Sequence, residues 1–306
     1  MSKPKILVTG SSGMVGSNLL HVLAINQKFE IYAANSRNMN LLDSSSVEKV
    51  LVDFKPDYII HAAGIVGGIQ MNINLQYKSL FENTKMSLNL IDAIKKQNKA
   101  SKLINLGSSC IYPKNLNKEY TPDDLLSGKL EPTNEGYALA KIICMKLIEH
   151  QKSDFFVGKT IVPCNLFGKN DSFDNISSHL IPAIIMKVND SKKSGEKIEV
   201  WGDGKARREF SYSRNLALFA LNFLENFNEY PEIVNFGEEH DYSILEYYEM
   251  ACEIIGCEKN FLFDLDKPVG MQSKKVDISF QKDINWVNPI SVEEGIKITN
   301  EFYKEL

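Results

Sequence analysis

The sequence predicts an α/β fold: a doubly wound, parallel Rossmann-type sheet followed by a smaller C-terminal substrate-binding domain. Apolar strand-like runs alternate with helical patterns through the first half of the chain, which is typical of βαβ units. A glycine-rich turn also joins the first strand to the first helix, as in nucleotide-binding folds.

The alternation can be followed from the start of the chain. Strand-like runs are "KILVTG", "EIYAAN", "YIIHAAG" and "KLINLGSS". Between them, helices are expected over 14–25, 45–54 and 79–96. The helix after "EPTNEG" and the strand "KTIVPCNLFG" are expected to extend the sheet to about residue 168.

The rhythm changes after this strand. A loop and a helix follow in "KNDSFDNISSHLIPAII", and the tail over 241–306 holds two amphipathic helices separated by short strands. We therefore expect a Rossmann domain over residues 1–170, to which the segment from about 211 to 238 returns, and a substrate domain over 171–306.

Composition limits the classes of function. The 306 residues are 43% apolar and carry a net charge of −4, with acidic and basic residues mixed along the chain. This indicates no basic face for nucleic acid, and no apolar run approaches the ~20 residues of a membrane span. Five cysteines without metal-ligand spacing suit free thiols in a reducing compartment. We expect a cytoplasmic protein that binds small ligands and no metal.

The stretch "ILVTGSSGMVGSNLL" combines a strand, a glycine turn and a helix start. Glycines allow a tight turn and a close approach of the backbone to a pyrophosphate, which then lies at the positive end of the helix. A turn required only for structure is the alternative. The expected cofactor contacts are Gly10, Gly13, Met14, Val15 and Gly16.

The end of the second strand favours NADP over NAD. An NAD site usually has an acid there, whereas this chain offers Asn35, Ser36 and Arg37. The alternative is that Arg37 is only a solvated surface residue. Asp43 is expected near the adenine edge, and the small residues over 61–68 near the nicotinamide ribose, unless they serve packing alone.

Tyr137 and Lys141 are four residues apart, so both project from one face of a helix. A nearby ammonium is expected to lower the pKa of a phenol and to hold the nicotinamide ribose. A proton can then pass from Tyr137 to a carbonyl oxygen as a hydride reaches the carbon. Ser108, at the end of "KLINLGSS", completes the set.

This set resembles the extended short-chain dehydrogenase/reductase superfamily. More narrowly, the chain is similar to the GDP-L-fucose synthase family, the GDP-4-keto-6-deoxymannose epimerase/reductases. The resemblance spans nearly the whole chain, through "GMVGSNL", "NLLD", "VGGI", "LGSSCIYPK", "LEPTNEGYALAK", "SHLIPA" and "VWGDGKARREF". It implies Ser108, Tyr137 and Lys141 as catalytic residues, NADPH as hydride donor, and a homodimer through the Tyr137 helix and the helix over 79–96.

Dehydratases of the superfamily carry Asp-Glu after the catalytic hydroxyl, where this chain has Ser109 and Cys110, so elimination of water is not expected. A ketone at carbon 4 acidifies the protons on carbons 3 and 5, and a thiol and an imidazole can act as base and acid near neutral pH. The resemblance implies Cys110 as base and His179 as acid, with His179 also at the cofactor. Without the resemblance, His179 would be taken as a helix-start residue.

On the substrate side, Asn165 is expected to bind the sugar or a phosphate, and Arg208 the pyrophosphate, for which a planar guanidinium is suited. Lys187 stands where many relatives have arginine, which keeps the charge but loses the fork. Trp201 is expected either beside the nucleotide or in the core.

We therefore expect an NADPH-dependent oxidoreductase that reduces carbon 4 of a GDP-linked 4-keto-6-deoxy sugar after epimerisation at carbons 3 and 5. An open alternative is a reductase of a related GDP-4-keto sugar, such as a heptose, with one or both epimerisations lost. A 4-epimerase that recycles bound NAD, and a non-catalytic module that senses NADP, are two others.

Overall fold

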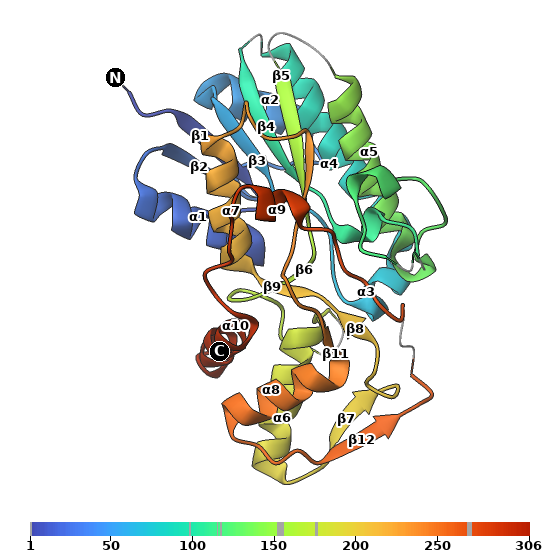
Figure 1. The fold of residues 1–306 in the computed structure, drawn as a ribbon. Helices are drawn as coiled ribbons and strands as arrows, with labels where there is room; N and C mark the ends of the chain where they lie inside the picture. Colours follow the sequence, from blue (N-terminus) through green and yellow to red (C-terminus); the bar gives the residue numbers. More distant parts are fainter. Residues whose placement is uncertain are drawn as a thin grey trace.

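Six parallel strands form the central sheet, in the order β10-β5-β4-β3-β1-β2 (Figure 1). The computed structural model describes residues 2–97, 99–114, 116, 118–151, 156–174, 177–267 and 271–306. The strands are β1 (Lys5–Thr9), β2 (Glu30–Ala34), β3 (Tyr58–His61), β4 (Ser101–Leu106), β5 (Phe156–Pro163) and β10 (Ile233–Phe236). The parallel, doubly wound sheet confirms the predicted α/β class.

Helices cover both faces of this sheet. One face carries α1 (Met14–Asn26), α7 (Ser213–Glu225) and the short α9 (Ser279–Asp283); the other carries α2 (Ser44–Phe54), α4 (Gln76–Lys96) and α5 (Glu135–His150). Successive side chains of a strand point to opposite faces, so Ile6 and Val8 join the first core and Leu7 the second. The predicted helices are confirmed to within a few residues at their starts and ends.

The smaller domain has its own core. Its parallel pair, β7 (Ile198–Trp201) and β12 (Phe261–Asp264), packs with α6 (Leu180–Ser194), α8 (Ile244–Ile255) and α10 (Val292–Lys304). The side chains of Ser243 and Ser291 cap α8 and α10. These caps define the two amphipathic helices that the tail predicts.

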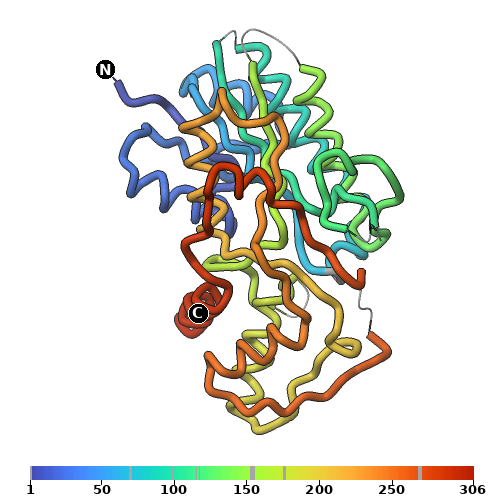
Figure 2. The backbone as a smooth tube through the Cα atoms, viewed as in Figure 1, coloured from blue at the N-terminus to red at the C-terminus, as the bar shows by residue number. Residues whose placement is uncertain are grey.

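The chain crosses between the two domains more than once (Figure 2), and short strands lie at these crossings (Figure 1). β6 (Asn165–Phe167) pairs in parallel with β9 (Phe210–Tyr212), and β8 (Arg207–Arg208) pairs antiparallel to β11 (Tyr242–Ser243). The predicted extension of the central sheet to residue 168 is therefore wrong. The sheet strand ends at Pro163, which offers no N–H, and the next amide, of Cys164, donates to the carbonyl of Phe236 at 2.8 Å.

A C-terminal segment returns to the sheet domain. Val276 forms a bridge with Tyr120, and the Trp286 ring lies 5.3 Å from the Phe219 ring of α7. The sheet domain also carries the short elements α3 (Ile69–Asn74), η1 (Ser109–Ile111), η2 (Pro122–Asp124) and η3 (Pro132–Asn134). None of the described helices is both long enough and apolar enough to span a bilayer.

Candidate active site

Two glycines of the turn between β1 and α1 are required by the packing of the protein itself. Gly10 has a φ of +66°, and a Cβ there would lie 2.7 Å from the Cα of Ala63. A Cβ on Gly16 would lie 2.0 Å from the carbonyl oxygen of Gly10. The turn therefore brings β1, α1 and the loop after β3 into direct contact.

Gly13 differs, because the protein leaves space beside it. Its φ of −81° suits any residue, and a Cβ would meet the Gly10 carbonyl oxygen at an ordinary 3.5 Å. Within the described first turn of α1, which contains Met14, Val15 and Gly16, no side chain is acidic. The unpaired N–H groups of a helix start, with space beside them, fit the pyrophosphate of NADP.

The loop after β2 presents the residues whose sequence favours NADP over NAD. The Oδ1 of Asn35 accepts a hydrogen bond from the Arg37 amide at 2.9 Å, and the Oδ1 of Asn38 accepts one from the Asn35 amide at 2.8 Å. The side chains of Ser36 and Arg37 are exposed on this preformed loop. Asp43, expected at the adenine edge, caps the N-terminus of α2.

The loop after β3 lies beside the site and is held in place by side-chain hydrogen bonds. The buried ring of His61 places Nδ1 2.9 Å from the Thr9 hydroxyl, and burial lowers the pKa of His61 to about 3. The ring is therefore neutral and structural. The Asn83 side chain accepts from the Ile65 amide at 2.7 Å and donates to the Ile65 carbonyl at 3.0 Å, which fixes the loop.

Ser108, Tyr137 and Lys141 meet at the carboxyl end of β4. The Ser108 side chain is a neighbour of the Tyr137 phenol and acts to lower its pKa. Lys141 lies one helical turn from Tyr137, with its Nζ 5.7 Å from the phenol ring centroid. This Nζ donates to the Leu106 carbonyl at 2.7 Å, its hydrogen-bond partner among the described residues, so two N–H groups remain for a ligand.

Burial controls the protonation of this trio. Tyr137 and Lys141 are only 8% and 7% exposed. Burial raises the pKa of Tyr137, and the neighbouring Ser108 side chain opposes this weakly; burial lowers the pKa of Lys141. The expected lowering of the phenol pKa is thus outweighed by burial. A protonated phenol is the form that a proton donor needs, so the site suits carbonyl reduction.

Cys110 lies on η1, in the same turn as Ser108. The Ser108 hydroxyl oxygen accepts from the Cys110 amide at 3.3 Å. The Cys110 sulfur accepts from Asn134 Nδ2 at 3.1 Å and from Lys274 Nζ at 3.4 Å. A charge on Cys110 also acts on Tyr137. The predicted base therefore lies beside the predicted proton donor.

His179 precedes the first turn of α6, in the smaller domain. Its Nδ1 lies 3.3 Å from Oδ1 of Asp171, whose side chain is buried. The loop before it contacts the loop after β3, because the Gly68 amide donates to the Ser177 carbonyl at 3.0 Å. Cys110 and His179 lie on different segments, η1 after β4 and the start of α6, and no hydrogen bond joins them in the described part of the chain.

A family model covers most of the elements that build this site. Residues 6–237 match the NAD dependent epimerase/dehydratase family. The chain belongs to this family. This confirms the family resemblance read from the sequence.

Two relatives that are similar over nearly the whole chain are named for GDP-linked sugars. A GDP-L-colitose synthase of Yersinia pseudotuberculosis is 44% identical over 98% of this chain and 97% of its own length. A GDP-L-fucose synthase of Azorhizobium caulinodans is 40% identical, covering 98% and 96%.

Two solved structures share the fold. A GDP-6-OMe-4-keto-L-xylo-heptose reductase from C. jejuni superposes with a TM-score of 0.92 at 25% identity, covering 100% of this chain and 99% of that one. A GDP-mannoheptose C4 reductase from Campylobacter jejuni with NADP bound gives 0.87 at 25% identity, covering 99% of each chain.

The paired arginines of β8 point to different partners in this family member. Arg207 forms ion pairs with Asp241 at 3.1 Å and with Glu246 at 3.3 Å, both within the smaller domain. Burial lowers the pKa of Arg208, and the charge of Glu131 from the sheet domain opposes this. Arg208 therefore lies near Glu131 and Tyr120 of the sheet domain.

The other predicted substrate residues have protein partners. The Nζ of Lys187 lies 3.0 Å from the Glu199 carboxylate and 5.4 Å from the Trp201 ring centroid. Trp201 is 36% exposed and its Nε1 donates to the same carboxylate, so it is not a core residue. Asn165 Nδ2 donates to the Glu209 carbonyl at 2.9 Å, which ties β6 to β9.

Three residues that the sequence did not single out belong to the site. Asn134 and Lys274 contact Cys110, and Asp171 contacts His179. Asn134 lies in the "EPTNEGY" motif, directly before the helix that contains Tyr137. This position could have indicated that Asn134 lies near the site. Lys274 is 164 residues from Cys110, and no periodicity in the sequence connects them.

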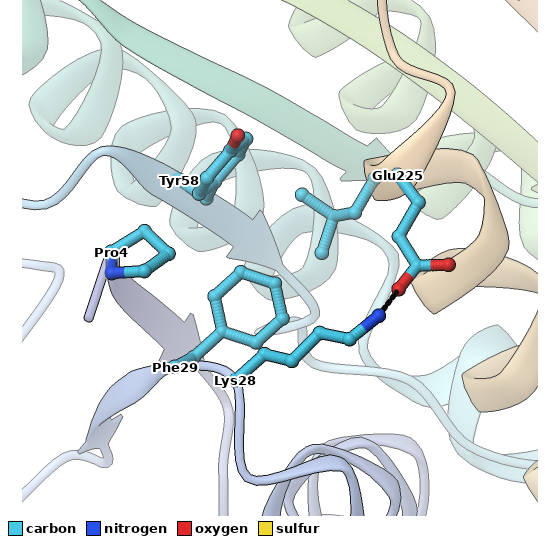
Figure 3. A pocket seen from close by; sticks show the side chains of 6 residues that line it. Pro4, Lys28, Phe29, Tyr58 and Glu225 are labelled. Carbon is cyan, nitrogen blue, oxygen red and sulfur yellow. Dashed lines mark hydrogen bonds and ion pairs between the residues drawn. The ribbon is translucent and has the colours of Figure 1, made fainter. Parts of the chain in front are cut away.

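A hollow elsewhere on the protein is unrelated to this site (Figure 3). Its lining includes Pro4, Phe29 and Tyr58, at the amino ends of the strands, and the ion pair of Lys28 with Glu225. In open α/β sheets, ligands bind at the carboxyl ends of strands. The hollow therefore carries no functional assignment.

Proposed function

We propose that the protein is an NADPH-dependent epimerase/reductase of a GDP-linked 4-keto-6-deoxy sugar. The observation that carries this proposal is that Tyr137 and Lys141 of α5 meet the turn at the end of β4, which contains both Ser108 and Cys110. Full-length relatives named for GDP-L-fucose and GDP-L-colitose support the choice of substrate class.

In the reduction step, NADPH supplies a hydride to carbon 4 of the sugar. The Ser108 hydroxyl and the Tyr137 phenol bind the ketone oxygen, and Tyr137 gives its proton to that oxygen as the alcohol forms. The buried Lys141 ammonium holds the nicotinamide ribose and stabilises the phenolate that remains. Solvent then returns the proton to Tyr137.

Epimerisation precedes reduction, because the ketone at carbon 4 is what acidifies carbons 3 and 5. The Cys110 thiolate removes a proton from one face of the carbon, and the resulting enolate is protonated from the other face by His179. Hydrogen bonding of His179 Nδ1 to Asp171 fixes the ring so that Nε2 is free to act.

Each domain binds one ligand in this proposal. Residues 1–170 together with 211–238 hold NADP(H), through the turn at Gly10 to Gly16, the loop from Asn35 to Arg37, and Lys141. The rest of residues 171–306 holds the GDP moiety, with Arg208 at the diphosphate and Lys187 and Trp201 near the nucleotide. Asn165, at the end of the sheet domain, binds the sugar or a phosphate.

The test is to incubate the protein with NADPH and GDP-4-keto-6-deoxymannose in deuterated water and to analyse the product by NMR. Deuterium at carbons 3 and 5, with the L-galacto configuration and consumption of NADPH, is the expected result. NADPH consumption without deuterium would leave a carbon-4 reductase, and no consumption with any 4-keto sugar would point to the NADP-sensing module.

A second candidate is a carbon-4 reductase of a GDP-4-keto-heptose, favoured by the 0.92 TM-score with a heptose reductase. Epimerisation at carbon 3 has meaning only where that carbon bears a hydroxyl. The substrate panel should therefore contain hexoses with and without a 3-hydroxyl and a heptose. The ranking of kcat/KM, with deuterium at carbon 3, carbon 5 or neither, separates the candidates.

We also propose a cytoplasmic homodimer. The "IICMKLI" segment of α5 contributes Ile142, Cys144, Met145 and Ile148 to the chain's own buried residues, but α4 has an apolar face in solvent. Tyr77, Phe81 and Leu88 of α4 are 77%, 52% and 46% exposed, and the first two rings are stacked. Five free cysteines suit a reducing compartment.

A further inference from the structure

The segment before α9 reaches the active site from the far end of the chain. In Figures 1 and 2 it runs beside the loops that follow β4. The Tyr120 amide donates to the Lys275 carbonyl at 2.9 Å, and the Asp277 amide donates to the Tyr120 carbonyl at 2.8 Å. The buried carboxylate of Glu209 accepts from the Val276 amide at 2.9 Å. The backbone over 275–277 is therefore fixed from two sides.

This anchoring decides where the two adjacent lysines point. In an extended segment successive side chains alternate. Lys275 points outward to an ion pair with Glu119 at 2.7 Å. Lys274 points inward, is 8% exposed, and donates to the Cys110 sulfur at 3.4 Å. Of the two charges, only that of Lys274 is directed at the site.

The direction of the contact with Cys110 is unambiguous. An ammonium has three donors and no acceptor, so the sulfur must accept. A thiolate accepts hydrogen bonds far better than a neutral thiol, and it is the ionised sulfur that acts as nucleophile or base. The Asn134 amide donates to the same sulfur at 3.1 Å. Two N–H donors on one sulfur describe a site built for a thiolate.

Among the described residues, burial weakens the acidic groups that could oppose the charge of Lys274. The ionisable groups packed around the pair are Tyr137 on α5, Cys164 after β5, and Glu209 and Glu238. Burial raises the pKa values of all four, to about 8 for Glu209, which shifts each of them toward its neutral form. Arg208 adds further positive charge near Tyr120.

We propose that Lys274 is a positioning residue for Cys110, whose ammonium holds the sulfur ionised and in place for proton removal beside the ketone. This inference rests on the epimerase part of the proposed function. The thiolate takes the proton from carbon 3 or 5, becomes a thiol, and later releases that proton to solvent, while Lys274 keeps its own proton throughout. The negative charge passes from sulfur to the enolate oxygen, and His179 supplies the proton that completes the inversion.

The first readout needs no substrate. Alkylation of Cys110 by iodoacetamide is followed by mass spectrometry across pH in Lys274→Met, Lys274→Arg and the matched control Lys275→Met. We expect Lys274→Met to slow alkylation at neutral pH by about tenfold and to move its midpoint to higher pH, because only the thiolate reacts. Lys274→Arg should restore most of the rate, and Lys275→Met should match the wild type.

The second readout separates proton removal from hydride transfer. Lys274→Met should lose about tenfold in deuterium exchange at carbons 3 and 5, yet reduce an already epimerised 4-keto sugar within about threefold of the wild type. Unchanged alkylation with a raised KM would overturn the proposal, because Lys274 would then act on the nucleotide sugar.

The two proposals fail in different ways. Absence of deuterium exchange in the wild type refutes the epimerase function, whereas wild-type alkylation in Lys274→Met refutes the role of Lys274. If Lys274→Met does not fold, Lys274→Arg and Lys274→Gln are compared, and equal alkylation of these two refutes the need for a cation.

Discussion

Single residues of the cofactor turn are constrained for different reasons. Gly10 and Gly16 lie against backbone atoms of the protein, whereas Gly13 lies beside open space at the start of α1. Glycine is thus required for packing at two positions of the motif and for the approach of a ligand at the third. That distinction is invisible in the sequence and is decided by which atoms surround each Cα.

Substitution Gly13→Ala should therefore affect binding and leave folding intact. Its φ is compatible with alanine, so stability should be unchanged or rise by about 0.4–1 kcal/mol through the unfolded chain. The methyl group would enter the space for the pyrophosphate and weaken NADPH binding by about tenfold or more, which is ~1.4 kcal/mol. NADPH fluorescence titration and thermal melting measure the two effects. Gly10→Ala, the comparison, should instead lower Tm; a normal NADPH affinity in Gly13→Ala would contradict this reading.

The chemical step should depend on one hydroxyl. Tyr137→Phe removes the proton donor without changing the packing of the ring, so kcat for reduction should fall by about 10²–10⁴-fold. NADPH affinity should stay close to that of the wild type, since Lys141 still lies beside Leu106. Stopped-flow measurement of NADPH oxidation and a binding titration check both values. A kcat within tenfold of the wild type would exclude Tyr137 as the donor.

At the scale of single residues, the sequence predicts those site residues whose position is set by one helix or by the end of one strand. Tyr137 and Lys141 are brought together by helical spacing alone, and Ser108 by the end of a buried strand. Lys274 and Asp171 are positioned by contacts between distant segments, where no local pattern exists. A sequence without structure therefore reveals the reductase trio more readily than the groups that orient Cys110 and His179.

At the scale of elements, starts and ends follow local chemistry. Asp43 caps α2 next to the predicted helix start at residue 45, and Ser243 and Ser291 cap the two helices expected in the tail. The path after Pro163 was harder to predict, because "KTIVPCNLFG" has continuous strand character. Pairing of β6 with β9 depends on a partner 45 residues later, at Asn165 and Phe210. The sequence of β6 itself does not indicate which strand it pairs with.

Glu209, between β8 and β9, should make stability depend on pH. Its carboxylate accepts from the amides of Glu238 and Val276, and burial raises its pKa from 4.5 to about 8. Between these values the folded chain keeps a proton that the unfolded chain loses, so the unfolding free energy falls as pH rises. Glu209→Gln cannot ionise and should lack this fall.

Urea titrations at several pH values between about 5 and 8 compare the wild type with this variant. The Glu209→Gln substitution is expected to cost about 1 kcal/mol at the acidic end, for one lost acceptor, and less or nothing at the alkaline end. His61 has the opposite effect: burial lowers its pKa, so its contribution makes the unfolding free energy rise with pH. Both proteins contain His61, so this contribution cancels when one unfolding curve is subtracted from the other. Glu119→Gln, on the surface, is the control. Parallel curves would contradict the assignment.

On the scale of the whole molecule, the exposed face of α4 should hold two copies together. Phe81→Glu places a charge in the centre of that face and should shift sedimentation from dimer to monomer at micromolar concentration. Because Phe81 is 52% exposed in the single chain, Tm should fall little beyond the loss of the dimer. Ile25→Glu, at an exposed apolar position on α1, is the matched control. A wild-type protein that sediments as a monomer would refute the dimer.

The anchoring of Val276 against Tyr120 also has a consequence for the order in which the molecule is made. During synthesis the loops after β4 leave the ribosome long before residues 271–278, and β5 also waits for its neighbour β10. The nascent chain therefore passes through a stage with an open sheet edge and with Cys110 lacking its lysine. Reactivity of the cysteine as a base is in this way coupled to completion of the chain, and a truncated product would hold the cofactor turn without the charged sulfur.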